Sequence, residues 1–294
     1  MEKLNIEQGT PEWLALRKNH LGSSDASIIM GASKWKISDG RIKTPYLLWK
    51  EKLGLEDLSC DNAATRYGKV MEEPARQAYQ EMVGDIVEPV CVKNTQHPYL
   101  LASLDGLNIT EDRAVEIKNC NFEDHKLAKE GKIPSKYYPQ VQLQIMVTGL
   151  PFIDYFSFHK GDGVIVKVER DEEYILDLSK KLDAFWKCVE TLKEPPLTDD
   201  DFIERDNIWE ETAEKLFTLK EDVKFLEKEV KKTEELLKNM SEGKNSRSGS
   251  YRYSFTSCRG SINYKLIPEL HKINLNKYRN GSIIKWSLKK DSCK

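Results

Sequence analysis

The sequence predicts an α/β protein, because short runs with strand periodicity stand between longer runs with helical periodicity. Residues 99–104 are mostly apolar, and residues 115–118 alternate apolar and charged side chains with period two, which indicates two strands. Residues 71–79, 140–147 and 172–192 have the apolar spacing of helices. A chain of 294 residues with 39% hydrophobic side chains can bury one sizeable core and carry a small appendage.

The two predicted strands are joined by the polar run 108–113, which predicts a hairpin. In such a hairpin Asp105 lies across from Glu116, and Glu116 and Lys118 share one face of their strand. Neighbouring carboxylates suit Mg²⁺ or Mn²⁺, which polarise phosphoryl oxygens and lower the pKa of bound water. Lys118 would then hold or deprotonate the attacking water. The spacing alone also fits an exposed hairpin with a surface Glu/Lys pair.

A candidate anion site lies near the N-terminus. Arg17 follows Trp13 by one turn of a predicted helix, and residues 21–30 predict a second helix capped by serine. A guanidinium, hydroxyls and free backbone N–H groups form an anion site that suits a terminal DNA phosphate. On these residues alone, the simpler interpretation is that Arg17 is a surface arginine and Ser24 is an ordinary helix cap.

Two further helices carry polar residues that bear on the hairpin. Glu72 lies on the predicted helix 71–79, which is expected to cross the sheet, with Gly68 allowing a close approach. A third carboxylate there would share the metal or orient its water. Gln140 and, more weakly, Gln142 are candidates on the next helix. As isolated residues they also fit solvated or structural positions.

Five motifs follow one another along residues 1–195. They are Glu7-Gln8-Gly9 with Trp13, Leu16-Arg17 and Gly22-Ser23-Ser24; Tyr67-Gly68-Lys69-Val70-Met71-Glu72; Ser103-Leu104-Asp105-Gly106; Glu116-Ile117-Lys118; and Tyr138-Pro139-Gln140-Val141-Gln142. In this order and spacing the chain resembles the lambda exonuclease family, also called YqaJ-like viral recombinases, a branch of the PD-(D/E)XK nucleases. The ordered set is far more specific than any single motif.

The resemblance implies a PD-(D/E)XK, restriction-endonuclease-like core, with a central mixed sheet flanked by helices. It implies a 5′→3′ exonuclease that uses Mg²⁺ or Mn²⁺, with two ions, and digests one strand of linear double-stranded DNA. The remaining 3′ single strand would serve a single-strand annealing or strand-exchange protein in phage-type recombination. Members of the family form ring-shaped trimers, so the resemblance also implies a trimeric ring.

The resemblance assigns roles to eight residues of this chain. The expected metal ligands are Asp105, Glu116, the carbonyl of Ile117 and Glu72. The expected supporting catalytic residues are Lys118 and Gln140. The expected ligands of the 5′-phosphate are Arg17 and Ser24.

Charge is distributed unevenly along the chain. Residues 244–294 carry twelve Lys and Arg against two acidic residues, a balance of +10, whereas the whole chain carries −2 and the remainder therefore −12. A basic tail suits non-specific, salt-dependent phosphate contacts, although a solvated charge-rich end fits the same composition.

The six cysteines show no CxxC pair and no Cys/His metal spacing, which indicates reduced thiols and argues against an iron–sulfur nuclease. The sequence shows neither a signal peptide nor an apolar run long enough to span a membrane. We therefore expect a cytoplasmic protein of a bacterial or phage-infected cell, with no membrane partner.

The chain is expected to divide into a nuclease core (1–200), a coiled-coil-like helix (205–240) and a basic accessory segment (241–294). The helix carries an a/d heptad seam, formed by Leu216, Leu219, Val223, Leu226, Val230, Thr233, Leu237 and Met240. Because the seam is short, we expect it to pack on the chain's own terminal segment rather than on a neighbouring subunit.

The accessory segment is expected to begin with a flexible turn over residues 241–250. Strand-like runs at 251–256 and 282–288 surround residues 267–273, so a small basic α+β unit is predicted. Basic and aromatic residues interleave here, a combination usable for tracking a DNA backbone and stacking on bases.

Two other functions remain open from the sequence. The same catalytic pattern serves endonucleases of repair and restriction, and the coiled helix with its basic tail would suit a DNA-binding recombination scaffold. A covalently closed circle separates an exonuclease from an endonuclease, because it has no ends. The presence of Asp105, Glu116 and Lys118 argues against a scaffold without activity.

Overall fold

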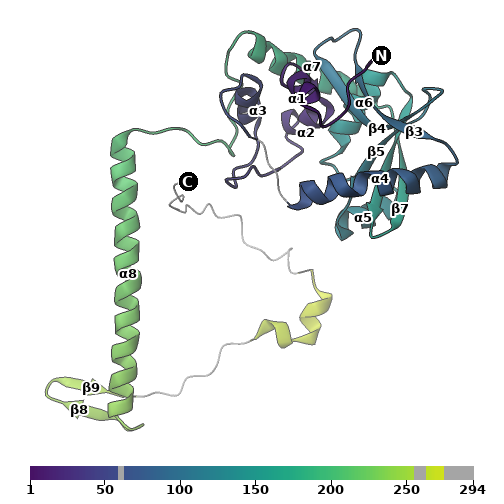
Figure 1. Cartoon of the computed structure of the whole chain (residues 1–294). Coiled ribbons are helices and arrows are strands. Elements are labelled where there is room, and N and C mark those ends of the chain that lie inside the picture. The colour runs from purple at the N-terminus through teal and green to yellow at the C-terminus, as the bar shows by residue number, and fades with distance from the viewer. Residues whose placement is uncertain (59–62, 255–262, 275–294) are drawn as a thin grey trace. The chain divides into compact units, whose positions relative to one another are not determined.

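The computed structural model describes residues 1–58, 63–254 and 263–274 (Figure 1). The chain divides into two compact units, Met1–Phe202 and Ile203–Lys294. The first unit holds every residue of the predicted nuclease site, and the second begins just before the long helix.

A seven-stranded mixed sheet forms the centre of the first unit. Its strands in spatial order are β1 (Glu2–Leu4), β3 (Val87–Lys93), β4 (Leu100–Asn108), β5 (Ala114–Asn119), β6 (Phe152–His159) and β7 (Asp162–Glu169), and the short β2 (Leu21–Gly22) pairs with β4. The pairs β2–β4 and β5–β6 are parallel, and the other neighbours are antiparallel. The predicted central mixed sheet is confirmed.

Helices cover both faces of this sheet. On one face α6 (Tyr138–Thr148) packs on β4 and β6, and α2 (Ser23–Ile29) and α7 (Glu172–Glu190) pack on α6. Two further helices add to this layer: α3 (Pro45–Lys52) packs on α2 and α7, and α5 (Phe122–Lys129) packs on β6 and β7. The helix α4 (Ala63–Val83) packs on the other face, where Tyr79 contacts Phe156. The first helix, α1 (Pro11–Lys18), packs next to β2.

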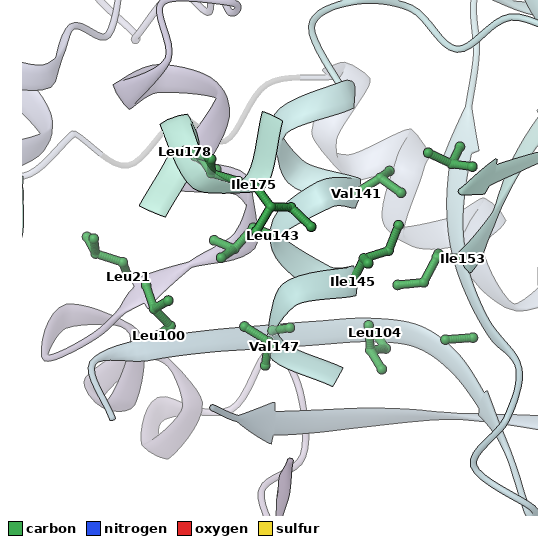
Figure 2. Close-up of a cluster of buried hydrophobic side chains, with 14 of the residues drawn as sticks. Leu21, Leu100, Leu104, Val141, Leu143, Ile145, Val147, Ile153, Ile175 and Leu178 are labelled. Atoms are coloured by element: carbon green, nitrogen blue, oxygen red, sulfur yellow. The ribbon is translucent and has the colours of Figure 1, made fainter. Parts of the chain in front are cut away.

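The larger core lies around α6. Figure 2 shows apolar side chains of α6 directed toward the sheet and toward α7. The labelled residues are Leu21, Leu100, Leu104, Val141, Leu143, Ile145, Val147, Ile153, Ile175 and Leu178. Because α6 is covered on several sides, it is apolar around most of its circumference, and the glutamines that it carries are buried.

Three local expectations are wrong. The N-cap of α2 is Gly22, whose N–H donates to the carboxylate of Asp25 at 3.0 Å, and not a serine. Gly68 lies inside α4, which begins at Ala63, and a Cβ at this position would meet nothing within 4 Å, so no close approach requires it. Residues 246–248 form a strand where a flexible turn was expected.

The second unit contains the 34-residue helix α8 (Asn207–Met240) and a hairpin of β8 (Ser246–Ser248) and β9 (Tyr251–Tyr253). Two 3₁₀ turns follow at Tyr264–Leu266 and Pro268–Lys272. No residue of α8 is buried, so the described part of the terminal segment leaves the heptad seam exposed. The expected packing of the seam on the terminal segment stays a prediction, because much of that segment lies outside the described residues. The predicted strand at 282–288 lies outside the described residues. Across the described residues, every helix is too short or too polar to cross a membrane.

Gly106 lies next to Asp105 in β4, at a position where the packing leaves no room for a side chain. A Cβ at Gly106 would stand 2.5 Å from Cγ2 of Val87 and 2.8 Å from Cγ1 of Val115. We expect Gly106→Ala to lower the free energy of unfolding by about 1–3 kcal/mol, because a packed core cannot admit the extra methyl without strain. Urea denaturation measures this change. The matched control is Gly68→Ala inside α4, which should be neutral or stabilising by up to about 1 kcal/mol; an equal loss in both variants would contradict the packing argument.

Candidate active site

The hairpin of β4 and β5 opens where the predicted carboxylates lie. Its ladder pairs Leu107 with Ala114 and Gly106 with Val115, and no further pair follows toward Asp105. The carboxylate of Asp105 takes the place of a ladder carbonyl and accepts the N–H of Ile117 at 2.7 Å. The two strands therefore separate at Asp105, which lies next to Glu116 as the spacing predicted.

Glu116 is held from the face covered by α6. Its side chain is 2% exposed and accepts hydrogen bonds from Nε2 of Gln140, at 2.6 Å, and from Nε2 of Gln144. Its Oε1 atom also pairs with Nζ of Lys118. Val115 and Ile117 pack in the core on the opposite face, so the period-two reading of β5 is correct. A buried carboxylate with three hydrogen-bond donors is fixed in place.

Lys118 is 23% exposed and lies between the carboxylates and an aromatic ring. Its Nζ is 5.2 Å from the centroid of the Tyr137 ring, and Nζ of Lys136 is 4.9 Å from the same centroid. Burial lowers the pKa of Lys118, but the charges of Glu116 and Asp105 outweigh burial and hold that pKa above its ordinary value. The ammonium therefore stays protonated at neutral pH, which favours holding a water over deprotonating it.

The charges around Asp105 show whether a metal cation would suit this site. Burial and the neighbouring charges of Glu116 and Glu72 raise the pKa of Asp105 well above its ordinary value, against the opposing effects of Lys118 and the Ile117 N–H. Two acidic side chains thus compete for one ammonium. Oxygen ligands with excess negative charge are the donor set that hard divalent cations prefer, so the residues fit Mg²⁺ or Mn²⁺.

Glu72 is joined to the site indirectly. Its side chain is 39% exposed and pairs with Nη2 of Arg76 at 3.0 Å, while Nε of Arg76 donates to the backbone carbonyl of Asp105 at 2.8 Å. Within the part of the chain that the structure describes, no three acidic, histidine or cysteine side chains converge as a metal cluster. The expected role of Glu72 in metal binding stays a prediction.

Arg17 and Ser24 meet as the sequence predicted. Nη2 of Arg17 donates to Oγ of Ser24 at 2.9 Å, and the guanidinium carbon is 4.7 Å from the centroid of the Trp13 ring. The indole N–H of Trp13 donates to Oγ of Ser103 on β4 at 2.9 Å, two residues before Asp105. This chain of contacts ties the guanidinium to the strand that carries the carboxylate.

Sequence reasoning missed three residues that shape the site: Gln144, Arg76 and Tyr137. Gln144 is fully buried, and its Oε1 atom has no hydrogen-bond partner among the described residues. Its position four residues after Gln140, on the same helical face, was the available signal. Gln142 points elsewhere, since it bonds the carbonyl of Glu169 and the N–H of Asp171.

Comparisons with known proteins agree with this geometry. Residues 12–151 match the model of the YqaJ-like viral recombinase domain. Over these residues the chain is similar to that family. The protein YqaJ of Bacillus subtilis (strain 168) is 30% identical over 188 residues, which are 62% of this chain and 57% of that protein. The predicted family resemblance is confirmed, and the chain spans little more than half the length of this curated relative.

Solved structures extend the likeness to the fold. The alkaline exonuclease LHK-Exo of Laribacter hongkongensis is 26% identical, with a TM-score of 0.52, over 62% of this chain and 94% of that one. Its complex with dAMP gives a TM-score of 0.53. The YqaJ-like domain thus shares the architecture of an alkaline exonuclease, and the predicted nuclease-type fold is confirmed.

Proposed function

We propose that this protein is a Mg²⁺- or Mn²⁺-dependent 5′→3′ exonuclease that digests one strand of linear double-stranded DNA. The observation that carries the proposal is the opened hairpin, which brings Asp105 and Glu116 together with Lys118 beside them. The YqaJ-like domain and the likeness to an alkaline exonuclease support the same reaction class.

Asp105, Glu116 and the Ile117 carbonyl are the residues that would hold a metal ion, with Glu72 near a second one. When bound, such an ion polarises a scissile phosphate and lowers the pKa of a water. The protein's own contribution is to fix the ligands: Gln140 and Gln144 hold Glu116, and the Ile117 N–H holds Asp105. Groups that hydrogen-bond to a metal ligand in this way set the orientation of that ligand.

Lys118 and Arg17 supply positive charge at two points of the substrate. The protonated Lys118 ammonium would donate to the attacking water and stabilise charge that develops on the phosphate. Arg17 with Ser24 would bind the 5′-phosphate of the end, so that the scissile bond is drawn toward the carboxylates. The product is a 3′ single strand, which suits a single-strand annealing protein as partner, and a trimeric ring remains the assembly that we expect of the nuclease unit.

Polarity is tested with linear duplex DNA that carries a label at either the 5′ or the 3′ end. The proposal predicts early release of the 5′ label as a mononucleotide, while the 3′ label stays in a long strand. Early release of the 3′ label would reverse the polarity, and release of either label in long fragments would indicate an endonuclease.

Arg17→Ala should remove a preference for phosphorylated ends. We expect wild-type protein to digest 5′-phosphorylated ends faster than 5′-hydroxyl ends, because a charge-assisted contact of about 1.5–3 kcal/mol forms only where the phosphate is present. In the variant the two rates should become equal through loss on the phosphorylated end. Initial rates on both substrates measure this.

The neighbouring exposed Lys18→Ala serves as the charge-matched control and should keep the preference. If Arg17→Ala slowed both substrates by the same factor, Arg17 would support structure or contact internal backbone instead.

A further inference from the structure

The helix α8 presents an apolar seam that the described residues of the chain leave uncovered. Val223 is 54% exposed and Leu226 is 60% exposed, and these two residues stand at the centre of the seam. The pattern assigns Trp209, Leu216, Val223, Val230 and Leu237 to position a, and Thr212, Leu219, Leu226, Thr233 and Met240 to position d. Helices in proteins gain most of their stability from packing of an apolar face, and no residue of α8 is buried, so a partner that covers the seam is expected.

Charges beside the seam oppose a parallel pair of two copies. In a parallel coiled coil each g residue faces the e residue five positions later on the other helix. All three fully charged pairs of this kind are like-charged: Lys215 with Lys220, Asp222 with Glu227, and Glu229 with Glu234. A parallel pair in register would also stack Thr233 on itself and Trp209 on itself in the apolar seam, which packs poorly.

Antiparallel pairing removes the stacking conflicts along the seam and reduces the number of like-charged contacts. When two copies of α8 overlap over their full length, Val223 faces Leu226 of the second copy and Trp209 faces Met240 of the second copy. Each seam threonine then faces a leucine, so large and small side chains alternate across the layers. Reversing the helix direction exchanges the a and d positions of the seam. Each a residue of one copy can therefore face a d residue of a second, identical copy.

The flanking charges also favour the antiparallel arrangement. Lys220 then faces Glu227 of the second copy, and this attractive pair occurs twice in each dimer. The like-charged contact of Asp222 with Glu229 of the second copy also occurs twice, against six like-charged contacts in the parallel pair. Glu229 already pairs with Lys232 on its own helix at 2.6 Å, which offsets part of that repulsion.

We propose that α8 is a self-association element, through which two copies of this chain pair in an antiparallel coiled coil. The seam spans nearly the whole helix, so the two Asn207 ends would stand about 50 Å apart in the pair. The proposal is independent of the nuclease reaction, since every residue that carries it lies in the second unit.

Molar mass in solution tests the pairing. We expect Leu226→Lys in the full-length chain to halve the mass found by light scattering, from two nuclease units or rings joined through α8 to one, because a charge in the central layer cannot be accommodated. Phe225→Lys is the matched control: Phe225 is equally exposed, at 63%, but lies off the seam, and this variant should keep the wild-type mass. Equal masses for wild type and Leu226→Lys would overturn the proposal and assign the seam to another segment or protein.

Charge reversal tests the orientation. Lys220→Glu should weaken the antiparallel dimer by about tenfold in dissociation constant, and adding Glu227→Lys should restore it. In a parallel dimer the same Lys220→Glu change would instead strengthen pairing, because Lys220 would face Lys215. Lys224→Glu, away from the seam, is the control and should change little. Strengthened or unchanged association of Lys220→Glu would contradict the antiparallel arrangement.

Discussion

Asp105→Asn is expected to lower the single-turnover rate on linear duplex DNA at least about 10³-fold while the protein stays folded. The reason is that the amide cannot supply the charged oxygen that a divalent cation needs, a loss of several kcal/mol of transition-state stabilisation. The amide oxygen can still accept the Ile117 N–H, so the opened hairpin keeps its shape. Rapid-quench kinetics measure the rate, and calorimetric titration with Mg²⁺ measures the lost metal affinity.

The same substitution should not cost stability. Burial and Glu116 raise the pKa of Asp105 in the folded state, so the folded protein holds this proton more tightly than the unfolded chain. The ionised carboxyl therefore weakens the metal-free fold at pH values above the unfolded pKa, and this penalty is absent below it. At neutral pH, Asp105→Asn should leave the free energy of unfolding unchanged or higher.

Asp112→Asn is the matched control, because Asp112 lies in the exposed turn of the same hairpin. It should keep wild-type cleavage. Retention of more than about a tenth of the wild-type rate in Asp105→Asn would place the reaction at another site.

Lys118→Met is expected to reduce cleavage by about 10²- to 10⁴-fold with Mg²⁺ still bound. The thioether keeps much of the length of the side chain but cannot donate to a water or offset charge on the phosphate. Because Asp105 and Glu116 remain, metal affinity by calorimetry should fall less than about threefold. A loss of rate together with an equal loss of metal affinity would show that Lys118 supports the ligands rather than the reaction.

The control for this variant is Lys136→Met. Lys136 also lies over the Tyr137 ring, at 4.9 Å, but pairs with Asp124 and not with the carboxylates of the site. Its removal should leave cleavage near wild type. A comparable loss in both variants would assign the effect to Tyr137 rather than to the ammonium at the site.

Much of the site follows from local sequence patterns. Alternation along β5 places Glu116 and Lys118 on one face, and the turn at 108–113 sets Asp105 beside them. The order of motifs predicted the family resemblance, and the short connection between α1 and α2 brings Arg17 to Ser24. These contacts depend on neighbours in the chain or on one hairpin, where sequence periodicity carries the geometry.

Contacts that depend on tertiary packing were not predictable in this way. Gln144 binds Glu116 because α6 lies across β5, and Arg76 reaches the Asp105 carbonyl because α4 packs on the opposite face. Gly22 is the N-cap of α2 because its N–H donates to the carboxylate of Asp25. The high frequency of serine at N-caps led to the prediction of a serine cap instead. The sequence of α8 shows the heptad repeat but does not identify the partner of the seam, because the side chains that cover a helix belong to another segment or molecule.

The most direct test of the proposed exonuclease compares linear and covalently closed circular duplex DNA of one sequence, with Mg²⁺ present. The account predicts that wild-type protein degrades the linear form and leaves the closed circle intact, and that Asp105→Asn degrades neither. Cleavage of the closed circle at a rate similar to the linear form, lost in Asp105→Asn, would show that the same site belongs to an endonuclease.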